Sequence, residues 1–218
     1  DTGAVAALLG DAPVVSSEGR AYPVDVVYSR ARKSDDRTVD RVAATIQRAL
    51  QDNPHSSVLA FLPGQGEIQR CRNVLQDWLS ERRVEGVHLR PLFGNLSIED
   101  QQRAINALSG KEAGDQKVVL ATNIAETSLT IDGVDVVVDS GLERAARFDP
   151  GTGMTGLHTL RISRSSSEQR AGRAGRQRPG KCYRLWSAEQ QQQLAAESSA
   201  EILTADLAPL ALQLLQWG

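Results

Sequence analysis

Short apolar runs along the chain alternate with stretches in which apolar residues recur at helical spacing. The runs VLAFL (58–62) and VVLA (118–121) are continuously apolar, as in strands that are covered on both faces. Before the first run, Val39, Val42 and Ile46 fall on one face of a helix. The alternation predicts an α/β fold: a parallel sheet covered by helices on both faces. The pattern predicts strands at 25–29, 57–63, 87–93, 117–122, 134–140 and 181–186, and helices at 36–50, 67–79, 97–108 and 165–175.

The alternation is interrupted near residue 143. Residues 143–148 and 154–162 flank the turn DPGTG, which predicts a β-hairpin that projects from the sheet. After Ser187 the chain becomes rich in Gln and Ala, and residues 205–217 form an amphipathic stretch. We therefore expect one domain over 1–187, with the hairpin at about 143–162. Residues 188–218 are expected to be a linker and the helical start of a following, truncated domain.

The composition of the 218 residues is that of a soluble globular protein, with 40% hydrophobic and 24% charged residues. Aromatic residues are only 4%, which argues against a platform on which nucleic-acid bases stack. No segment reaches the length of a membrane span, and there is no signal peptide. Cys71 and Cys182 are far apart, and the histidines are scattered. We expect no disulfide, no metal site and a reducing, cytoplasmic environment.

The net charge of −2 hides a basic segment within an acidic chain. Residues 142–184 contain ten Lys and Arg against three Asp and Glu. Four of the arginines, at positions 170, 173, 176 and 178, are separated mostly by Ala and Gly. Such a segment indicates an anionic partner, either a nucleotide or a nucleic acid, and a solvated surface is the alternative.

Two stretches imitate phosphate-binding motifs but lack the required context. GTGMTG (151–156) matches G-x-G-x-x-G, yet it sits in the expected hairpin turn instead of between a strand and a helix. GRQRPGKC (175–182) has Cys182 where a phosphate loop needs Ser or Thr, and a strand follows it. The chain therefore has no phosphate loop of its own, and it has no Asp-Glu-x-His box to hold Mg²⁺.

Four stretches, in order along the chain, resemble motifs of superfamily 2 helicases. VLAFLPGQGEI (58–68) resembles the fourth motif of the DEAH-box branch, and LFGNLSIEDQQRA (92–104) the segment after it. ATNIAETSLTIDG (121–133) resembles the fifth motif of that branch, and QRAGRAGR (169–176) the sixth motif of the superfamily. GLERAARFDPGTGM (141–154) and the C-terminal 19 residues are similar to the bacterial HrpB members. The resemblance covers essentially the whole chain.

The resemblance implies that residues 1–187 are the second of two RecA-like domains, and that 188–218 begin a winged-helix-like domain. Such a chain is half of an NTP-dependent 3′–5′ RNA helicase and is not catalytic alone. Its implied partners are single-stranded RNA, the first RecA-like domain and the C-terminal domains of the same polypeptide. ATP or another NTP, with Mg²⁺, binds only when the first domain is present. A nucleic-acid-binding module without an ATPase partner and a superfamily 2 DNA helicase stay open as alternatives.

The sixth motif carries the implied catalytic residues. At helical spacing Gln169, Arg173 and Arg176 share one face, and we expect that face to approach the ridge of strand carboxyl ends. The resemblance assigns Arg173 and Arg176 as arginine fingers on the γ-phosphate, and Gln169 as a partner of the phosphate or the attacking water. Arg170 and Arg178 are expected to pair with acids on the surface.

The other implied site residues come from the fifth motif and the segment before it. By resemblance, the nucleotide is also contacted by Ser128, Thr130, Asp132 and Ile105, with Ile105 standing where eukaryotic relatives often have an aromatic residue that stacks on the adenine. RNA is contacted by Thr122, Asn123, Gly94, Asn95 and Arg144. Two points stay open: Gly94 is also compatible with an ordinary strand-to-helix turn, and Glu126 with a structural acid that pairs with an arginine.

Overall fold

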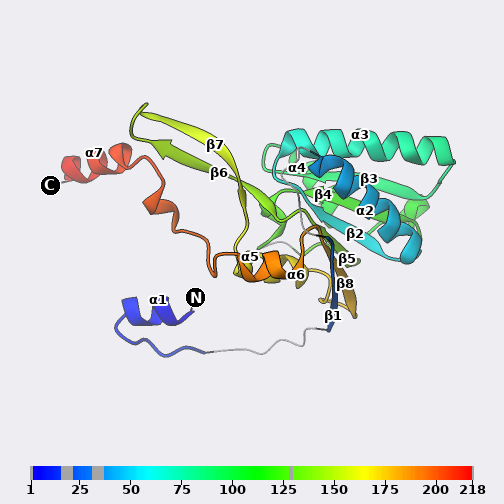
Figure 1. Ribbon diagram of the computed structural model, residues 1–218, viewed down its shortest axis with the longest axis horizontal. Helices are drawn as coiled ribbons and strands as arrows, with labels where there is room; N and C mark the ends of the chain where they lie inside the picture. The colour runs from blue at the N-terminus through cyan, green and yellow to red at the C-terminus, as the bar shows by residue number, and fades with distance from the viewer. Residues whose placement is uncertain (1, 16–21, 31–36, 128–129, 218) are drawn as a thin grey trace.

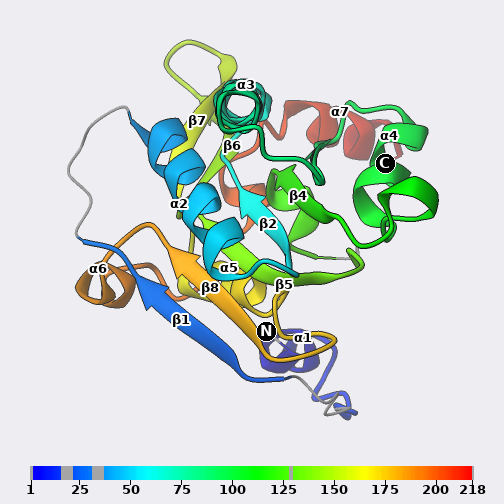
Figure 2. The same ribbon diagram turned by 90° about the vertical axis from the view of Figure 1, so that its right-hand side faces the viewer.

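The computed structural model describes residues 2–15, 22–30, 37–127 and 130–217. Its centre is a six-stranded sheet in the order β1-β8-β5-β2-β4-β3, in which every pair of neighbouring strands is parallel (Figures 1 and 2). The sequence pattern predicted this α/β architecture, and the structure confirms it. The strands are β1 Val24–Tyr28, β2 Ser57–Phe61, β3 Val87–Leu92, β4 Gln116–Ala121, β5 Val134–Asp139 and β8 Gly180–Arg184.

Helices cover both faces of the sheet. Successive residues of each central strand point to opposite sides, so each strand contributes apolar side chains to both faces. In β2, Val58 and Ala60 pack with α2 and α3, whereas Leu59 and Phe61 face α4 and α5. Figure 2 shows α2 and α3 together on one side of the sheet. The period-2 pattern thus gives the domain two apolar cores, one for each face. The helices that form them are α2 Thr38–Asp52, α3 Gln65–Arg82, α4 Ile98–Ile105 and α5 Arg164–Ala171.

The predicted hairpin is present and projects from the sheet (Figure 1). Strands β6 Leu142–Asp149 and β7 Met154–Arg161 pair antiparallel, and GTGMTG spans their turn, as the sequence context indicated. The remaining helices are α1 Thr2–Leu8, α6 Ala188–Gln192 and α7 Ala208–Trp217, with 3₁₀ turns η1 Gly110–Glu112, η2 Asn123–Ala125 and η3 Glu201–Leu203. None of the described helices combines the length and the apolarity that a membrane span requires.

Both cysteines are core residues. Cys71 in α3 and Cys182 in β8 are buried free thiols that belong to different apolar cores. Burial raises the pKa of each thiol to about 12. Because the thiolate is the reactive form, these side chains act as small apolar groups and not as nucleophiles.

Candidate functional site

The arginine-rich segment begins on a helix and continues into a turn. Helix α5 ends at Ala171 and is capped by Gly172, so Arg173 and Arg176 lie in the turn that leads to β8. The prediction that Gln169, Arg173 and Arg176 share one face of a helix over 165–175 is therefore wrong. Two glycines lie in the predicted last turn, and each lowers helix stability by about 0.5–1 kcal/mol relative to alanine.

This turn is held against the amino end of β1. The Gly175 carbonyl accepts a hydrogen bond from the Tyr22 N–H at 2.8 Å, two residues before β1 begins. A Cβ at position 175 would lie 2.5 Å from the Tyr22 carbonyl oxygen, so only glycine fits. Because the strands are parallel, this contact puts the turn at the edge formed by the strand amino ends. The expectation that the sixth motif approaches the carboxyl ends is therefore wrong for the turn at Gly175.

Arg173 and Arg176 both reach the segment that joins β4 to β5. Arg173 is 6% exposed, and its Nε donates to the Glu126 carbonyl oxygen at 3.0 Å, with Nη2 donating to the same atom. Arg176 is exposed, and its Nη1 donates to the Thr130 hydroxyl at 2.9 Å. Burial, and secondly the charge of Arg176, lower the pKa of Arg173.

These two guanidinium groups form a positive site beside Glu126 and Thr130. Among the ion pairs of the described residues, none includes Arg176, and Arg173 uses a main-chain carbonyl of Glu126. Like charges held close together repel, and an anion placed against both relieves the repulsion. Guanidinium groups match phosphate oxygens bidentately, so the residues present fit the triphosphate of a nucleotide.

Other residues predicted to bind the nucleotide lie near this turn. The Asp132 N–H donates to the carbonyl oxygen of Ile105, the half-buried last residue of α4, at 2.9 Å. Thr130 contacts Arg176 as described above, so the structure brings the end of the fifth motif together with the sixth motif. Ser128 lies outside the described residues. Gln169 is exposed on α5, and no described hydrogen bond joins it to either arginine.

The residues predicted to bind RNA lie at the opposite edge, where the strands end. Thr122 follows β4 and Asn123 opens η2, while Gly94 and Asn95 form the turn after β3. The Thr122 N–H donates to the Leu92 carbonyl at 3.2 Å, which brings the two strand ends side by side. The location that the sequence predicted for these four residues is confirmed. A Cβ on Gly94 would meet no atom within 4 Å, so both interpretations of this residue stay open.

Arg144 is separate from these four residues in its contacts. Its Nη2 donates to Glu67 Oε1 at 3.1 Å, and its side chain is 38% exposed. The Arg144 side chain lies over Gly64, where a Cβ would come within 2.8 Å of the guanidinium. Glycine at the start of α3 thus leaves room for an arginine from the hairpin. Its role in binding RNA remains a prediction.

Arg170 pairs with acids as predicted, but it does so in the interior and not on the surface. It was expected to pair with acids on the surface, yet it is 1% exposed. Its Nε donates to Glu126 Oε2 at 3.0 Å and its Nη1 to Asp139 Oδ1 at 3.1 Å and to the Leu142 carbonyl. The guanidinium also lies 4.8 Å from the Phe61 ring centroid. The contact with Arg170 favours the interpretation of Glu126 as a structural acid that pairs with an arginine.

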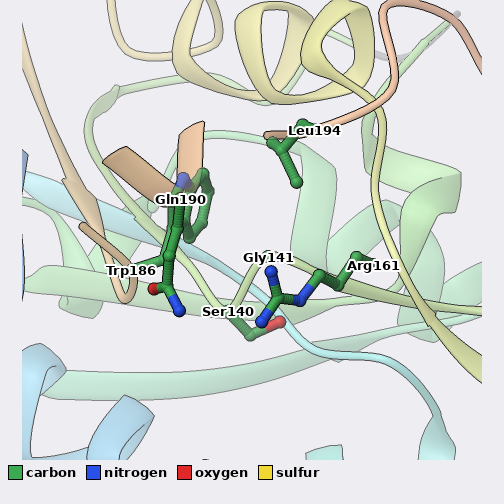
Figure 3. A pocket seen from close by; sticks show the side chains of 6 residues that line it. All are labelled: Ser140, Gly141, Arg161, Trp186, Gln190 and Leu194. Carbon is green, nitrogen blue, oxygen red and sulfur yellow. The ribbon is translucent and has the colours of Figure 1, made fainter. Parts of the chain in front are cut away.

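A pocket lies at the base of the hairpin, at the carboxyl ends of β5 and β8 (Figure 3). Gly141 has φ 73°, and a Cβ there would lie 2.8 Å from the Trp186 ring, so this tight turn requires glycine. None of the residues predicted to bind nucleotide or RNA lines the pocket, which separates it from the candidate site. Its lining consists of Ser140, Gly141, Arg161, Trp186, Gln190 and Leu194.

Comparison with known proteins connects this geometry to a family. Residues 41–178 match the family model of the helicase conserved C-terminal domain. The ATP-dependent RNA helicase HrpB of Escherichia coli (strain K12) is 50% identical over 97% of this chain and 25% of its own length. The ATP-dependent RNA helicase DEAH11, chloroplastic, of Arabidopsis thaliana is 35% identical over 100% of this chain and 12% of its length.

Solved structures agree with the sequence relatives. The crystal structure of Escherichia coli DEAH/RHA helicase HrpB superposes with a TM-score of 0.88 at 48% identity, covering 100% of this chain and 27% of that one. A second crystal structure, of the E. coli DExH-box NTPase HrpB, gives a TM-score of 0.85 at 48% identity and covers 100% of this chain and 26% of that one. The chain therefore spans about a quarter of the HrpB proteins that it matches.

Proposed function

The chain belongs to the family of helicase conserved C-terminal domains, and we propose that it acts as the second RecA-like domain of an HrpB-type, DEAH-box RNA helicase. One observation carries the proposal: Arg173 and Arg176 form a positive pair without a carboxylate on Arg176, beside the segment that ends in Asp132. Phosphoryl transfer requires such groups, because negative charge spreads over the equatorial oxygens of the transferred phosphoryl.

In this proposal the nucleotide is held between two domains. Arg173 and Arg176 donate to the γ-phosphate, and Gln169 orients the phosphate or the attacking water. The apolar side chain of Ile105 forms a wall for the base, and Asp132 lies near the ribose or the water shell of Mg²⁺. Thr130 and Ser128 complete this side of the pocket. A first RecA-like domain supplies the phosphate loop and the acids for Mg²⁺, which neutralises phosphate charge when bound.

RNA binds at the opposite edge of the sheet. Thr122 and Asn123 contact phosphate and sugar, and the turn at Gly94 and Asn95 extends the same exposed edge. Arg144 adds a contact from the foot of the hairpin. Because the segment 122–133 begins at the RNA edge and ends at the nucleotide edge, it offers a direct path between the two sites. Opening and closing against the first domain then moves the protein along single-stranded RNA from 3′ to 5′.

We further propose the domain division at residue 187. The RecA-like domain occupies 1–187, and 188–218 are a linker and the beginning of a winged-helix-like C-terminal domain. Exposed apolar side chains on α7 support this division, since a contiguous apolar surface usually marks a contact with another protein part. The whole protein is proposed to act in the cytoplasm. The exposed apolar residues of α7 are Leu210, Leu212, Leu214, Leu215 and Trp217.

Unwinding by the full-length protein tests the proposed function. We expect it to separate an RNA duplex with a 3′ single-stranded tail in the presence of NTP and Mg²⁺, and to act less well on a DNA duplex of the same sequence. The 218-residue chain alone should hydrolyse almost no NTP, because it lacks a phosphate loop. Strand separation that is equal on DNA and RNA would favour a DNA helicase, and NTP-independent binding alone would favour a nucleic-acid-binding module.

The isoleucine at position 105 predicts that the full-length protein discriminates only weakly between the bases of the four NTPs. An isoleucine provides an apolar wall but no ring to stack on an adenine, and aromatic stacking contributes about 1–3 kcal/mol per base. The full-length protein should therefore hydrolyse ATP, GTP, CTP and UTP with kcat/KM values within about tenfold of each other. Ile105→Phe should raise the preference for purine nucleotides, and Ile98→Phe, at an exposed position at the other end of α4, should not. A strong preference of the unmodified protein for ATP would contradict this reasoning.

A further inference from the structure

Lys117 is a buried cation to which the proposed function assigns no role. It follows Gln116 at the start of β4 and is only 1% exposed. Its Nζ donates to the Asn106 carbonyl at 2.6 Å and to the Ile105 carbonyl at 3.3 Å. Lysine is almost never fully buried without a partner, because removing its charge from water costs free energy. The contacts of this side chain therefore need an explanation.

The two carbonyls that bind Lys117 belong to the C-terminal end of α4. The last carbonyls of a helix lack partners within the helix and carry the negative end of its dipole, so an ammonium group is a favourable partner. The Ile105 carbonyl also accepts the N–H of Asp132. The buried ammonium thus joins β4 to the end of α4, and the Ile105 carbonyl that it binds also joins the segment before β5.

The charged surroundings of Lys117 tie it to Asp132. Burial lowers its pKa to about 8, and the charge of Asp132 opposes that shift while Arg90 adds to it. Arg90 is bound by Glu112 at 2.8 Å, and His88 is the register neighbour of Lys117 on β3. Lys117 is therefore still charged at neutral pH, and the carboxylate that attracts it is one of the proposed nucleotide-binding residues.

We propose that Lys117 is a positioning residue of the nucleotide pocket, which fixes the end of α4 and Asp132 so that Ile105 meets the base and Asp132 meets the ribose. The inference rests on the proposed function and deepens it. Lys117 itself touches no substrate. Its loss is expected to weaken nucleotide binding and to leave the phosphoryl-transfer step, which depends on Arg173 and Arg176, nearly unchanged.

The test compares Lys117→Met with Lys111→Met, a matched change at an exposed position in η1. Both variants are made in the full-length protein. Three quantities are measured: the Kd of a fluorescent ADP analogue with Mg²⁺, the KM and kcat of RNA-stimulated ATP hydrolysis, and amide hydrogen exchange over residues 98–108 without nucleotide. For Lys117→Met, Kd and KM should rise about tenfold with kcat nearly constant, the pattern of lost ground-state binding. Exchange near Ile105 should accelerate, and Lys111→Met should change nothing.

Loss of folding is not expected to obscure the result. Because the pKa of Lys117 lies below its unfolded value, its favourable contribution to the free energy of unfolding is present above pH 10.5 and lost as pH falls through about 8. At pH 7 methionine removes the cost of the buried charge but also the two hydrogen bonds to the end of α4, and because these effects oppose each other the melting temperature should change little.

Each other outcome overturns the inference in a distinguishable way. A lower melting temperature with unchanged Kd would make Lys117 a purely structural residue. Faster exchange near Ile105 with unchanged Kd and KM would show a clamp on α4 that the nucleotide does not use. If the unmodified full-length protein binds no nucleotide, the proposed function fails, and the role of Lys117 fails with it.

Discussion

Replacing Arg173 by alanine in the full-length protein should lower RNA-stimulated NTP turnover by about 10³–10⁵-fold, the contribution of an arginine finger to phosphoryl transfer. The guanidinium is already buried at the edge of the proposed pocket, next to Arg176, and it binds the Glu126 carbonyl. A triphosphate placed against both arginines relieves the repulsion between their charges. RNA binding should be retained, since the residues assigned to RNA lie at the other edge of the sheet.

Two further variants separate this role from a structural one. Arg173→Lys keeps a positive charge but loses the planar, bidentate group, so most of the turnover should still be lost while the domain stays folded. Arg48→Ala removes an exposed arginine from α2, on the opposite face of the sheet, and should leave turnover within about twofold. The measurement is the rate of phosphate release at saturating RNA. Unchanged turnover in Arg173→Ala would remove the finger assignment.

Most of the fold could be predicted from local patterns. The runs that became β2, β4 and β5 are nearly continuously apolar because both faces of the sheet are covered, and the helices between them have the expected spacing. The hairpin followed from its turn residues. The end of α5 was missed because the small residues around Arg173 were taken as helix, although Gly172 and Gly175 favour a turn.

The edge on which the Gly175 turn lies could also have been predicted. Residues that precede a strand lie at its amino end, and Gly175 and Arg176 come shortly before β8. The burial of Arg170 could not be predicted in the same way, because its acceptors Glu126 and Asp139 are distant in sequence. One local signal existed: Asp139 is the last residue of a buried strand, and a buried carboxylate in that position needs a cation.

Replacing Arg170 by methionine is expected to produce the largest loss of stability. Arg170 holds Glu126, Asp139 and the first residue of the hairpin, and all its surroundings are buried or nearly so. Burial alone would lower the pKa of Arg170, but the carboxylates of Asp139 and Glu126 outweigh that effect and raise it, so Arg170 stays charged. Burial raises the pKa of Asp139, and the charge of Arg170 opposes that shift. Removing one member of a buried ion pair costs about 3–5 kcal/mol, because the other member is left uncompensated.

Arg103→Met is the matched control, since Arg103 also pairs with a carboxylate, that of Glu99, but both side chains are exposed, at 61% and 75%. Exposed pairs contribute about 0–1 kcal/mol, so urea titrations of the 218-residue chain followed by circular dichroism should separate the two variants clearly. Adding Asp139→Asn to Arg170→Met should recover part of the loss, because the buried negative charge is then gone. If Arg170→Met and Arg103→Met lowered the free energy of unfolding equally, the buried network would contribute no more than a surface pair, and the link from the fifth and sixth motifs to the hairpin would lose its physical basis.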